Sequence, residues 1–463
     1  MNLVIHWFRR DLRVNDNTAL HHASTRAKKV LPVFILEDAL RTGPDVGAAR
    51  LAFLLQSLES LQQNLQHLGY PLIVRAGKSE IEIPKLCAEV GADAVFANKR
   101  YEPYAAARDG RVFRALNAAG IGFELFKDAV VWEEKELLTT TGNPYTVFTP
   151  YSKAWKARRI PPPWPKLARN AQGLPDVPSL AVPTDPGEFG FPLKQSLFPA
   201  GEAAAQKALT TFIRDRLANY KVNRDLPAVE GTSQLSPHLR AGAVGIRTIV
   251  AKLKEARPAE DTFLNELIWR EFFLQILTNF PHVMRGSMRP EFDALRWENE
   301  ESKFAAWRAG QTGYPIVDAA MRCLNATGWM HNRLRMIVAM FLTKDLLVHW
   351  QWGERYFMQQ LVDGDMAANN GGWQWSAGTG ADAAPYFRIF NPTSQSIRFD
   401  PEAMFIKRWV PELADAPIHL CHEPWKESLA TRAYAQRIVL HEEQRPKCLA
   451  MYAAAKKRPS GKA

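Results

Sequence analysis

The segment Thr262–Phe280 carries an acid, an indole and a guanidinium on one face of an amphipathic helical pattern. Glu266, Trp269, Arg270 and Phe273 stand at i, i+3, i+4 and i+7, so they share that face. Such a set suits a flat, anionic ligand that forms hydrogen bonds, for example a nucleobase with its phosphate. The same spacing suits an intrahelical ion pair beside a core tryptophan, worth about 0.2–0.5 kcal/mol. The helix alone favours this second interpretation.

A second group of unusual residues begins at Asp363-Gly364-Asp365 and continues through Asn369-Asn370-Gly371-Gly372-Trp373-Gln374-Trp375. Two acids around a glycine usually mark a turn. Here, however, the acids lie in an apolar region rich in tryptophan, and a buried acid needs a sugar hydroxyl, a ring N–H or an arginine as its partner. We therefore favour a ligand site over a plain loop.

Two shorter clusters could receive phosphate. Thr232–Ser236 offers hydroxyls and free backbone N–H groups at a predicted helix start, although simple helix capping is the more frequent reason for such a string. Gly328–Met336 opens another predicted helix, where His331, Arg333 and Arg335 gather. A phosphate contact and a basic, solvated turn are about equally good interpretations of that second cluster.

The composition narrows the class of protein. The 463 residues hold 59 Lys and Arg against 48 Asp and Glu, a net charge of +11 with a pI near 9.4, which favours a polyanionic partner such as nucleic acid. The four cysteines are far apart, which argues against a disulfide scaffold or a zinc site and favours a reducing compartment. Because no membrane-length apolar run and no signal peptide is found, we expect a cytoplasmic protein with no membrane partner and no metal.

The elements that must position these residues fall into two classes. Residues 1–130 alternate short apolar strands with helical patterns, which predicts an α/β domain with a doubly wound parallel sheet. The expected strands are Leu3–Phe8, Val30–Leu36, Pro71–Arg75, Ala94–Asn98 and Phe123–Phe126, and the clearest helix is Ala48–Leu68. No strand is followed by GxGxxG, and no P-loop motif occurs, so the usual nucleotide-binding fingerprints are missing.

Residues 131–200 form the expected interdomain linker, because ten of the 31 prolines fall between Pro161 and Pro199. Residues 201–452 are predicted to form an all-α domain, and residues 453–463 a basic, flexible tail. Ten of the 14 tryptophans lie between Trp269 and Trp425. This clustering fits a large helical core, stacking surfaces or redox chemistry.

Several of these motifs together resemble the photolyase/cryptochrome family, and most of all its class I cyclobutane pyrimidine dimer (CPD) photolyases. The resemblance covers nearly the whole chain, and the block from Gly313 to Arg388 is the most specific part of it. It rests on Trp7–Arg13, Thr232–Ser236, Asn265–Phe272, Thr312–Arg322, Trp329–Arg335 and Asp363–Trp375. It implies that FAD lies folded in the helical domain, which would account for the missing dinucleotide fingerprint.

The resemblance also implies which residues hold FAD. Arg335 would pair with Asp363, and Asn369 would face N5 of the flavin and help to keep it reduced. Phe263 stands where relatives carry a tryptophan against the cofactor. The residues implied for cofactor binding are Tyr220, Thr232, Ser233, Gln234, Leu235, Ser236, Phe263, Arg335, Asp363, Gly364, Asp365 and Asn369.

The implied activity is that of a carbon–carbon lyase driven by light, which splits pyrimidine dimers flipped out of DNA. Glu266, Trp269, Met336 and Trp375 would contact the dimer and, with Asn369, form the implied catalytic set. The implied DNA contacts are Arg224, Glu266, Trp269, Arg270, Asn332, Arg333 and Gln395, and the implied electron-transfer chain is Trp297, Trp350 and Trp373. We expect a monomer that acts on DNA containing pyrimidine dimers.

A second, antenna chromophore is implied less specifically. Folate-binding relatives carry Asn-Glu where this chain has Tyr104-Ala105, and Cys-Lys where it has Met284-Arg285, which argues against methenyltetrahydrofolate. Glu102-Pro103-Tyr104 and Arg108-Asp109-Gly110 look more like relatives that bind 8-hydroxy-5-deazaflavin or FMN, although Ala105-Ala106 replaces a usual Gly-Arg.

The alternatives are a (6-4) photolyase, a cryptochrome-type blue-light photoreceptor, and a flavoprotein that binds DNA without catalysis. The first needs a second histidine near the lesion, where this chain has Met336. A cryptochrome usually has a long C-terminal extension or altered site residues, and this chain ends soon after Tyr452. The residues implied to bind the dimer argue against the third alternative.

Overall fold

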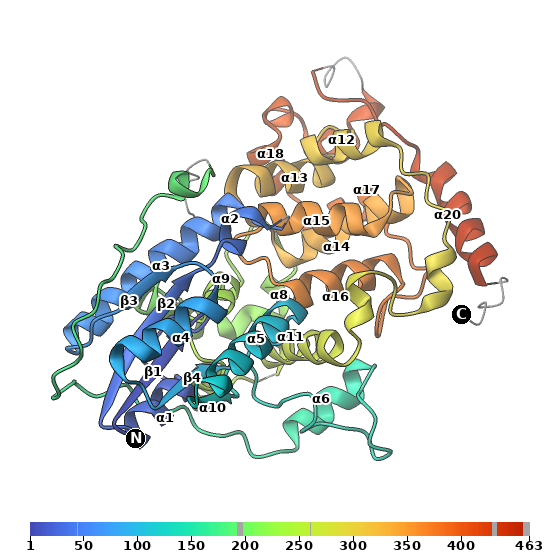
Figure 1. Ribbon diagram of the computed structural model, residues 1–463. Helices are drawn as coiled ribbons and strands as arrows, with labels where there is room; N and C mark the ends of the chain where they lie inside the picture. The colour runs from blue at the N-terminus through green and yellow to red at the C-terminus, as the bar shows by residue number, and fades with distance from the viewer. Residues whose placement is uncertain (44, 192–197, 260, 428–432, 457–463) are drawn as a thin grey trace.

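Five short apolar runs of the first 130 residues form one parallel sheet in the computed structural model, which describes residues 1–43, 45–191, 198–259, 261–427 and 433–456 (Figure 1). The strands are β1 (Leu3–Phe8), β2 (Lys29–Leu36), β3 (Ile73–Ala76), β4 (Ala94–Asn98) and β5 (Gly122–Phe126). Their order is β3-β2-β1-β4-β5, and β1 pairs with both β2 and β4. The predicted doubly wound sheet is therefore confirmed.

Helices bury both faces of this sheet, which explains why its inner strands read as continuous apolar runs. On one face α1 (Thr18–Arg26) and α3 (Ala48–His67) pack against side chains such as Val4 and Phe34. On the other face α4 (Ser79–Val90) and α5 (Pro103–Ala118) pack against Ile5 and Val33. A short helix, α2 (Ala39–Thr42), lies between β2 and α3.

The proline-rich segment runs in extended form along the outer side of the sheet domain, where it appears as the green trace beside α3 in Figure 1. The backbone N–H of Leu180 donates to the carbonyl of Val74 at 2.9 Å, so the segment pairs with the edge strand β3. An edge covered in this way is closed to pairing with other chains. The expected linker, 131–200, also contains α6 (Phe148–Lys156) and a 3₁₀ turn, η1 (Pro186–Phe189).

The helical domain follows, and its helices begin and end where the sequence provides local signals. Helix α13 (Pro315–Thr327) starts with proline at its first position and ends at Gly328, whose φ of +70° suits glycine. The other α-helices are α7 (Glu202–Asp215), α8 (Tyr220–Asn223), α9 (Ser236–Ala241), α10 (Ile246–Ala256), α11 (Thr262–Asn279), α12 (Glu301–Ala309), α14 (Asn332–Met340), α15 (Trp350–Gln360), α16 (Met366–Ala377), α17 (Pro392–Phe399), α18 (Met404–Trp409), α19 (Ile418–His422) and α20 (His441–Lys456).

Short 3₁₀ turns and a π-helical turn join these helices. The π-helical turn, η5 (Phe341–Asp345), continues directly from α14. The 3₁₀ turns are η2 (Leu217–Asn219), η3 (Pro281–Met284), η4 (Pro290–Ala294), η6 (Pro411–Leu413) and η7 (Pro424–Lys426). Helix α20 reaches Lys456, so residues 453–456 of the expected flexible tail are helical, and residues 457–463 lie outside the described residues.

A buried ion network joins the two domains. Arg247 on α10 donates to Asp16 Oδ1 and to Asp128 Oδ1, each at 2.8 Å, and Arg13 donates to Asp128 Oδ2 at 2.6 Å. Burial alone would raise the pKa of Asp128, but the two guanidinium groups hold that pKa well below its ordinary value. The network therefore holds the helical domain against the ends of the sheet.

No helix in the described part of the chain is both long enough and apolar enough to cross a lipid bilayer.

Candidate cofactor and nucleic-acid site

Helix α11 presents an aromatic and an acidic side chain one turn apart. Phe263 packs edge-on against Tyr220 at 5.2 Å between ring centroids. One turn later, Glu266 Oε1 accepts a hydrogen bond from Arg224 Nη1 at 2.6 Å. The Arg224 and Glu266 side chains are 21% and 30% exposed, so this ion pair can be reached from solvent. The structure thus places Tyr220, Arg224, Phe263 and Glu266 together.

Arg335 and Asp363 form the ion pair that the resemblance implies. Arg335 Nη2 donates to Asp363 Oδ2 at 2.8 Å, and Arg335 Nε donates to the carbonyl of Met330 at 2.9 Å. Within the described residues, the other carboxylate oxygen of Asp363, Oδ1, is buried without a hydrogen-bond partner. Such an oxygen needs a donor, and the imide N–H or a ribose hydroxyl of FAD would supply one. The residues present therefore fit this cofactor.

The start of α16 orders the amide side chains next to this acid. Asp365 caps the helix by accepting from the N–H of Ala368 at 3.2 Å. Asn369 Nδ2 donates to the carbonyl of Glu354, and Asn370 Nδ2 donates to Glu354 Oε1, both at 2.9 Å. Burial raises the pKa of Glu354 to about 7. Among the described residues, the side-chain oxygen of Asn369 accepts no hydrogen bond.

The two halves of the implied cofactor site lie side by side. Arg240, one turn after Ser236 on α9, donates to the carbonyl of Gly364 at 3.2 Å. A Cβ at Gly364 would overlap Nη1 of Arg50, so a larger residue here would require the Arg50 side chain to shift. Among the described residues, Leu235 is the N-cap of α9 and makes no side-chain capping bond. Ser233 Oγ accepts from the N–H of Leu235 at 3.4 Å, so this hydroxyl serves the start of the helix.

Several of the implied DNA-contacting residues also form one patch. Arg333 pairs with Asp225 at 2.7 Å, next to Arg224, and lies 4.3 Å over the ring of Phe399 on α17. Its Nη1 is 3.8 Å from the sulfur of Met336. Gln395 stands one turn before Phe399, and its Oε1 is buried without a partner in the part of the chain that the structure describes. Asn332 is exposed at the start of α14.

The two implied lesion-stacking tryptophans are half-buried on neighbouring helices. Trp269 on α11 stacks on Phe148 with parallel rings 3.8 Å apart, so one of its faces is already covered. Trp375 lies on α16, which packs against α11. Arg270, another residue expected to contact DNA, is partly exposed. It donates to the carbonyl of Ala129 at 2.8 Å and faces Asp365 and Arg100 at the domain interface.

The three implied electron-transfer tryptophans differ in depth. Trp350 and Trp373 are buried, whereas Trp297 is partly exposed and meets Trp350 through His349. The ring centroids are 5.4 Å apart for Trp297 and His349, and 5.8 Å apart for His349 and Trp350. A Cβ at Gly353, one turn after Trp350, would overlap the indole of Trp373. Trp373 therefore packs on the face of α15 that carries Trp350.

Sequence reasoning missed a cluster of guanidinium groups between the two domains. Arg10 follows β1, Arg100 follows β4, and Arg50 and Arg240 reach the same place from α3 and α9. Burial and these like charges lower the pKa of Arg240 well below its ordinary value. Glu102 binds Arg10 and Arg100 at 2.5 and 2.6 Å. No motif signals this cluster, because it is assembled from four separate elements.

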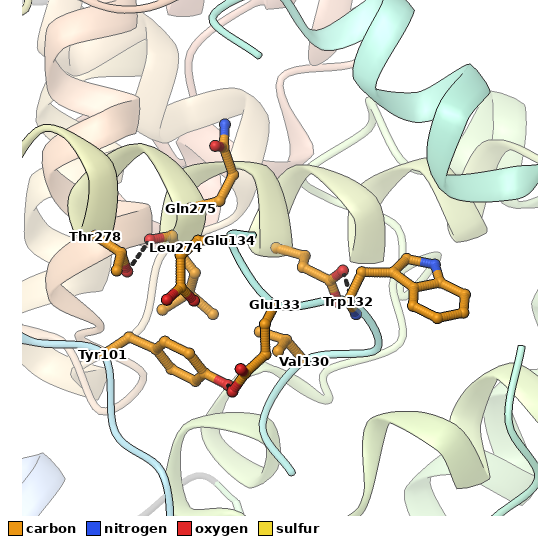
Figure 2. A pocket seen from close by; sticks show the side chains of 9 residues that line it. Tyr101, Val130, Trp132, Glu133, Glu134, Leu274, Gln275 and Thr278 are labelled. Carbon is orange, nitrogen blue, oxygen red and sulfur yellow. Dashed lines mark hydrogen bonds between the residues drawn. The ribbon is translucent and has the colours of Figure 1, made fainter. Parts of the chain in front are cut away.

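A small cavity lies beside the C-terminal half of α11 (Figure 2). Glu133, Glu134 and Glu271 contribute carboxylates to its wall, and Tyr101 donates to Glu133 at 3.0 Å. Burial raises the pKa of Glu271 to about 7, and its oxygens accept from the N–H groups of Val131 and Trp132.

The described residues contain no group of three or more His, Cys, Asp or Glu side chains arranged to hold a metal ion.

Comparison with known proteins identifies the family. Residues 4–168 match the model of a DNA photolyase domain, and residues 263–454 match the FAD binding domain of DNA photolyase. The deoxyribodipyrimidine photo-lyase of Escherichia coli is 42% identical over 97% of this chain and 98% of its own. A class III photolyase from Agrobacterium tumefaciens superposes with a TM-score of 0.90 at 37% identity, covering 99% of this chain and 98% of its own. An archaeal photolyase from Sulfolobus tokodaii that holds two FAD molecules gives a TM-score of 0.88 at 35% identity, covering 98% of this chain and all of its own. The chain therefore belongs to the DNA photolyase family.

Proposed function

We propose that this protein uses light and FAD to split cyclobutane pyrimidine dimers in DNA. The observation that carries this proposal is the arrangement on α11, where Phe263, which would touch the cofactor, and Glu266, which would touch the dimer, are one turn apart. Residues three apart on a helix face the same side, about 5–6 Å from one another. A lesion held at Glu266 would therefore lie next to the cofactor.

FAD would supply the electron that opens the dimer, and the protein would supply binding and orientation. Asp363 Oδ1 would accept a hydrogen bond from the cofactor, while Arg335 holds this carboxylate in place. Asn369, held by the carbonyl of Glu354, would present its own oxygen at a defined place. Tyr220 and Phe263 would pack against the cofactor, and Thr232–Ser236 with Arg240 would lie near its phosphates.

DNA would bind across the patch that Arg224, Arg333, Asn332 and Gln395 form. Phosphate contacts by arginine give affinity independent of sequence, and the net charge of +11 favours them. The dimer would leave the duplex, which costs less at a lesion that pairs weakly. The Glu266 carboxylate would then accept from its base edges, between Trp269, Trp375 and Met336.

We further propose that Trp297, Trp350 and Trp373 carry electrons inward from solvent when the cofactor has been oxidised. Trp297 is partly exposed whereas Trp350 and Trp373 are buried, which fits a chain that begins at the surface. Repair itself needs no outside electron, so this chain serves photoreduction only.

Arg10 and Arg100, on the sheet side of the guanidinium cluster, support an anionic antenna chromophore. Arg10 and Arg100 lie at the carboxyl ends of β1 and β4, which is the switch point where doubly wound sheets bind ligands. A bound anion, such as 8-hydroxy-5-deazaflavin or the phosphate of FMN, would reduce the repulsion between these guanidinium groups. Reconstitution with each chromophore and with methenyltetrahydrofolate tests this choice. Tight folate binding with efficient energy transfer would contradict it.

A lesion-specific assay tests the main proposal. The reduced, FAD-loaded protein is illuminated with two otherwise identical oligonucleotides, one with a single CPD and one with a single (6-4) photoproduct. We expect the CPD alone to be restored to two pyrimidines. Repair of the (6-4) lesion, or repair of neither, would overturn the proposal. A protein that holds no flavin after gentle purification and reconstitution would also overturn the proposal, before any repair assay.

A further inference from the structure

Trp373 is in ring contact with a tryptophan that lies outside the proposed chain. The rings of Trp373 and Trp307 meet edge to face, with centroids 6.1 Å apart. Phe357 contacts both, at 5.1 Å from Trp373 and 6.1 Å from Trp307. We propose that Trp307 is a second direct electron donor to Trp373, so that the electron route branches at Trp373.

The surroundings of Trp307 suit a side chain that holds positive charge for a short time. Its indole is fully buried, and its Nε1–H donates to the carbonyl of Val338 at 3.1 Å. Loss of one electron makes this N–H a stronger donor, and hydrogen bonds from charged donors are roughly twice as strong as neutral ones. The carbonyl of Val338 therefore stabilises the oxidised indole.

The branch continues toward the surface through Phe304. Phe304 stacks on Trp307 at 5.8 Å with an interplanar angle of 16°, and Trp352, which is partly exposed, lies 5.2 Å beyond it. A benzene ring is harder to oxidise than an indole, and the guanidinium of Arg308 lies 4.8 Å over Phe304. Phe304 thus separates two indoles as a bridge and does not itself hold the charge. Trp352 is the outer end of the branch.

The electron balance is simple. Trp373 loses one electron to the light-excited cofactor, Trp307 gives one electron to the Trp373 radical cation, and Trp352 gives one to the Trp307 radical cation. A thiol in solution then reduces Trp352 and releases its proton to water. One thiol electron is thus consumed for each electron delivered, and no bond in the protein is broken.

The inference rests on the proposed role of Trp373, and the test separates the two. Thiol-driven photoreduction of the oxidised holoprotein is compared in Trp373→Phe, Trp350→Phe, Trp350→Phe/Trp307→Phe and Trp350→Phe/Trp352→Phe. We expect Trp373→Phe to lose photoreduction. Trp350→Phe should still be photoreduced, at a lower rate than wild type. The double variants with Trp307→Phe or Trp352→Phe should lose this remaining photoreduction. Trp350→Phe/Trp409→Phe is the matched control and should retain the rate of Trp350→Phe. Trp409 packs on the same core and makes no ring contact with Trp373 among the described residues.

Transient absorption of the tryptophan radical gives a second readout, independent of steady-state flavin reduction. Trp350→Phe should still form a tryptophan radical beyond Trp373, and its lifetime should shorten when Trp307 is replaced. Flavin content and melting temperature show that each variant is folded, since Trp307→Phe loses one hydrogen bond but Val338 keeps a backbone donor in Phe341. If Trp350→Phe is as inactive as Trp373→Phe, the branch is wrong and the chain of three stands. If Trp373→Phe photoreduces normally, the assignment of Trp373 fails and the branch fails with it.

Discussion

The Asp363 carboxylate combines burial, a single arginine partner and one oxygen without a donor among the described residues. Its side chain is 3% exposed, whereas that of Arg335 is 27% exposed. Apolar side chains in place of such a pair would cost little folding free energy, because the desolvation of the two charged groups offsets much of their attraction. A half-satisfied buried acid is therefore better explained by a ligand than by stability.

Replacing Asp363 by Asn tests this explanation. The variant keeps the volume but removes the charge that Arg335 and the proposed cofactor share. Loss of a hydrogen bond to a charged group costs about 1.5–3 kcal/mol, so the Kd for FAD should rise about 10- to 100-fold. Equilibrium titration of the apoprotein with FAD measures this. Glu412→Gln, which breaks the more exposed Arg322–Glu412 pair, should leave the Kd unchanged. Unaltered FAD affinity in Asp363→Asn would remove this residue from the site.

Glu266→Gln separates lesion recognition from general DNA binding. The Glu266 carboxylate accepts a hydrogen bond from Arg224. When the dimer binds, one carboxylate oxygen would accept from the dimer instead. We expect binding of CPD-containing DNA to weaken by about 1.5–3 kcal/mol while binding of undamaged DNA changes little. Fluorescence anisotropy with both duplexes measures the two effects. Glu230→Gln, at the exposed Arg216–Glu230 pair, is the control. Equal losses on both duplexes would contradict the role of Glu266.

At the scale of elements, the packing of α15 against α16 depends on one glycine. Gly353→Ala would place a methyl group inside the indole of Trp373, so the ring must move. Overpacking of this kind typically costs about 1–3 kcal/mol. We expect a lower melting temperature and slower photoreduction, while chemically reduced protein repairs dimers normally. Gly110→Ala on α5, where the new Cβ would lie 3.8 Å from the flexible end of Arg114, should change neither rate. Normal photoreduction in Gly353→Ala would show that the position of Trp373 is not critical.

The sequence predicted the bounds of uniformly buried elements well. It was less accurate where a single side chain caps a helix or packs on a distant segment. β1 and β4 have the expected bounds because each is a fully buried apolar run. The helix expected to open within Gly328–Met336 begins only at Asn332, because the His331 side chain caps it by accepting from the N–H of Arg333. Helix α6 was hidden inside the expected linker, since its Trp155 packs on a distant segment, α11.

The site could be predicted only in part, for a related reason. Motif resemblance implied the pair of Arg335 and Asp363, and the structure contains it. The contact of Arg224 with Glu266, the placement of Arg270 at the domain interface, and the approach of Arg50 to Gly364 join residues at least 40 positions apart. Helical periodicity reports on neighbours within about two turns, so it cannot show such contacts.

At the scale of the whole molecule, the domain interface depends on Arg247. Arg247→Met would leave Asp16 and Asp128 buried with less compensation, at a cost of about 3–5 kcal/mol in unfolding free energy. Chemical denaturation measures this. Lys252→Met, at an exposed pair on the same helix, should have little effect.

The pH dependence of this interface has a defined sign. Because the folded-state pKa of Asp128 is depressed, its contribution is fully present above the unfolded value of about 3.9 and is lost as the pH falls below it. The stability difference between wild type and Arg247→Met should therefore shrink only in that acidic range. A difference that persists unchanged at low pH would contradict the assigned ion network.

The most direct measurement of the central claim is the number of thymine dimers that the reduced, FAD-loaded protein removes from irradiated DNA in light and in darkness. The account predicts that dimers disappear only under light, in proportion to bound FAD, and that undamaged thymine is recovered in the same DNA strand. Dimers that persist in light despite full FAD occupancy, or that disappear equally in darkness, would contradict it.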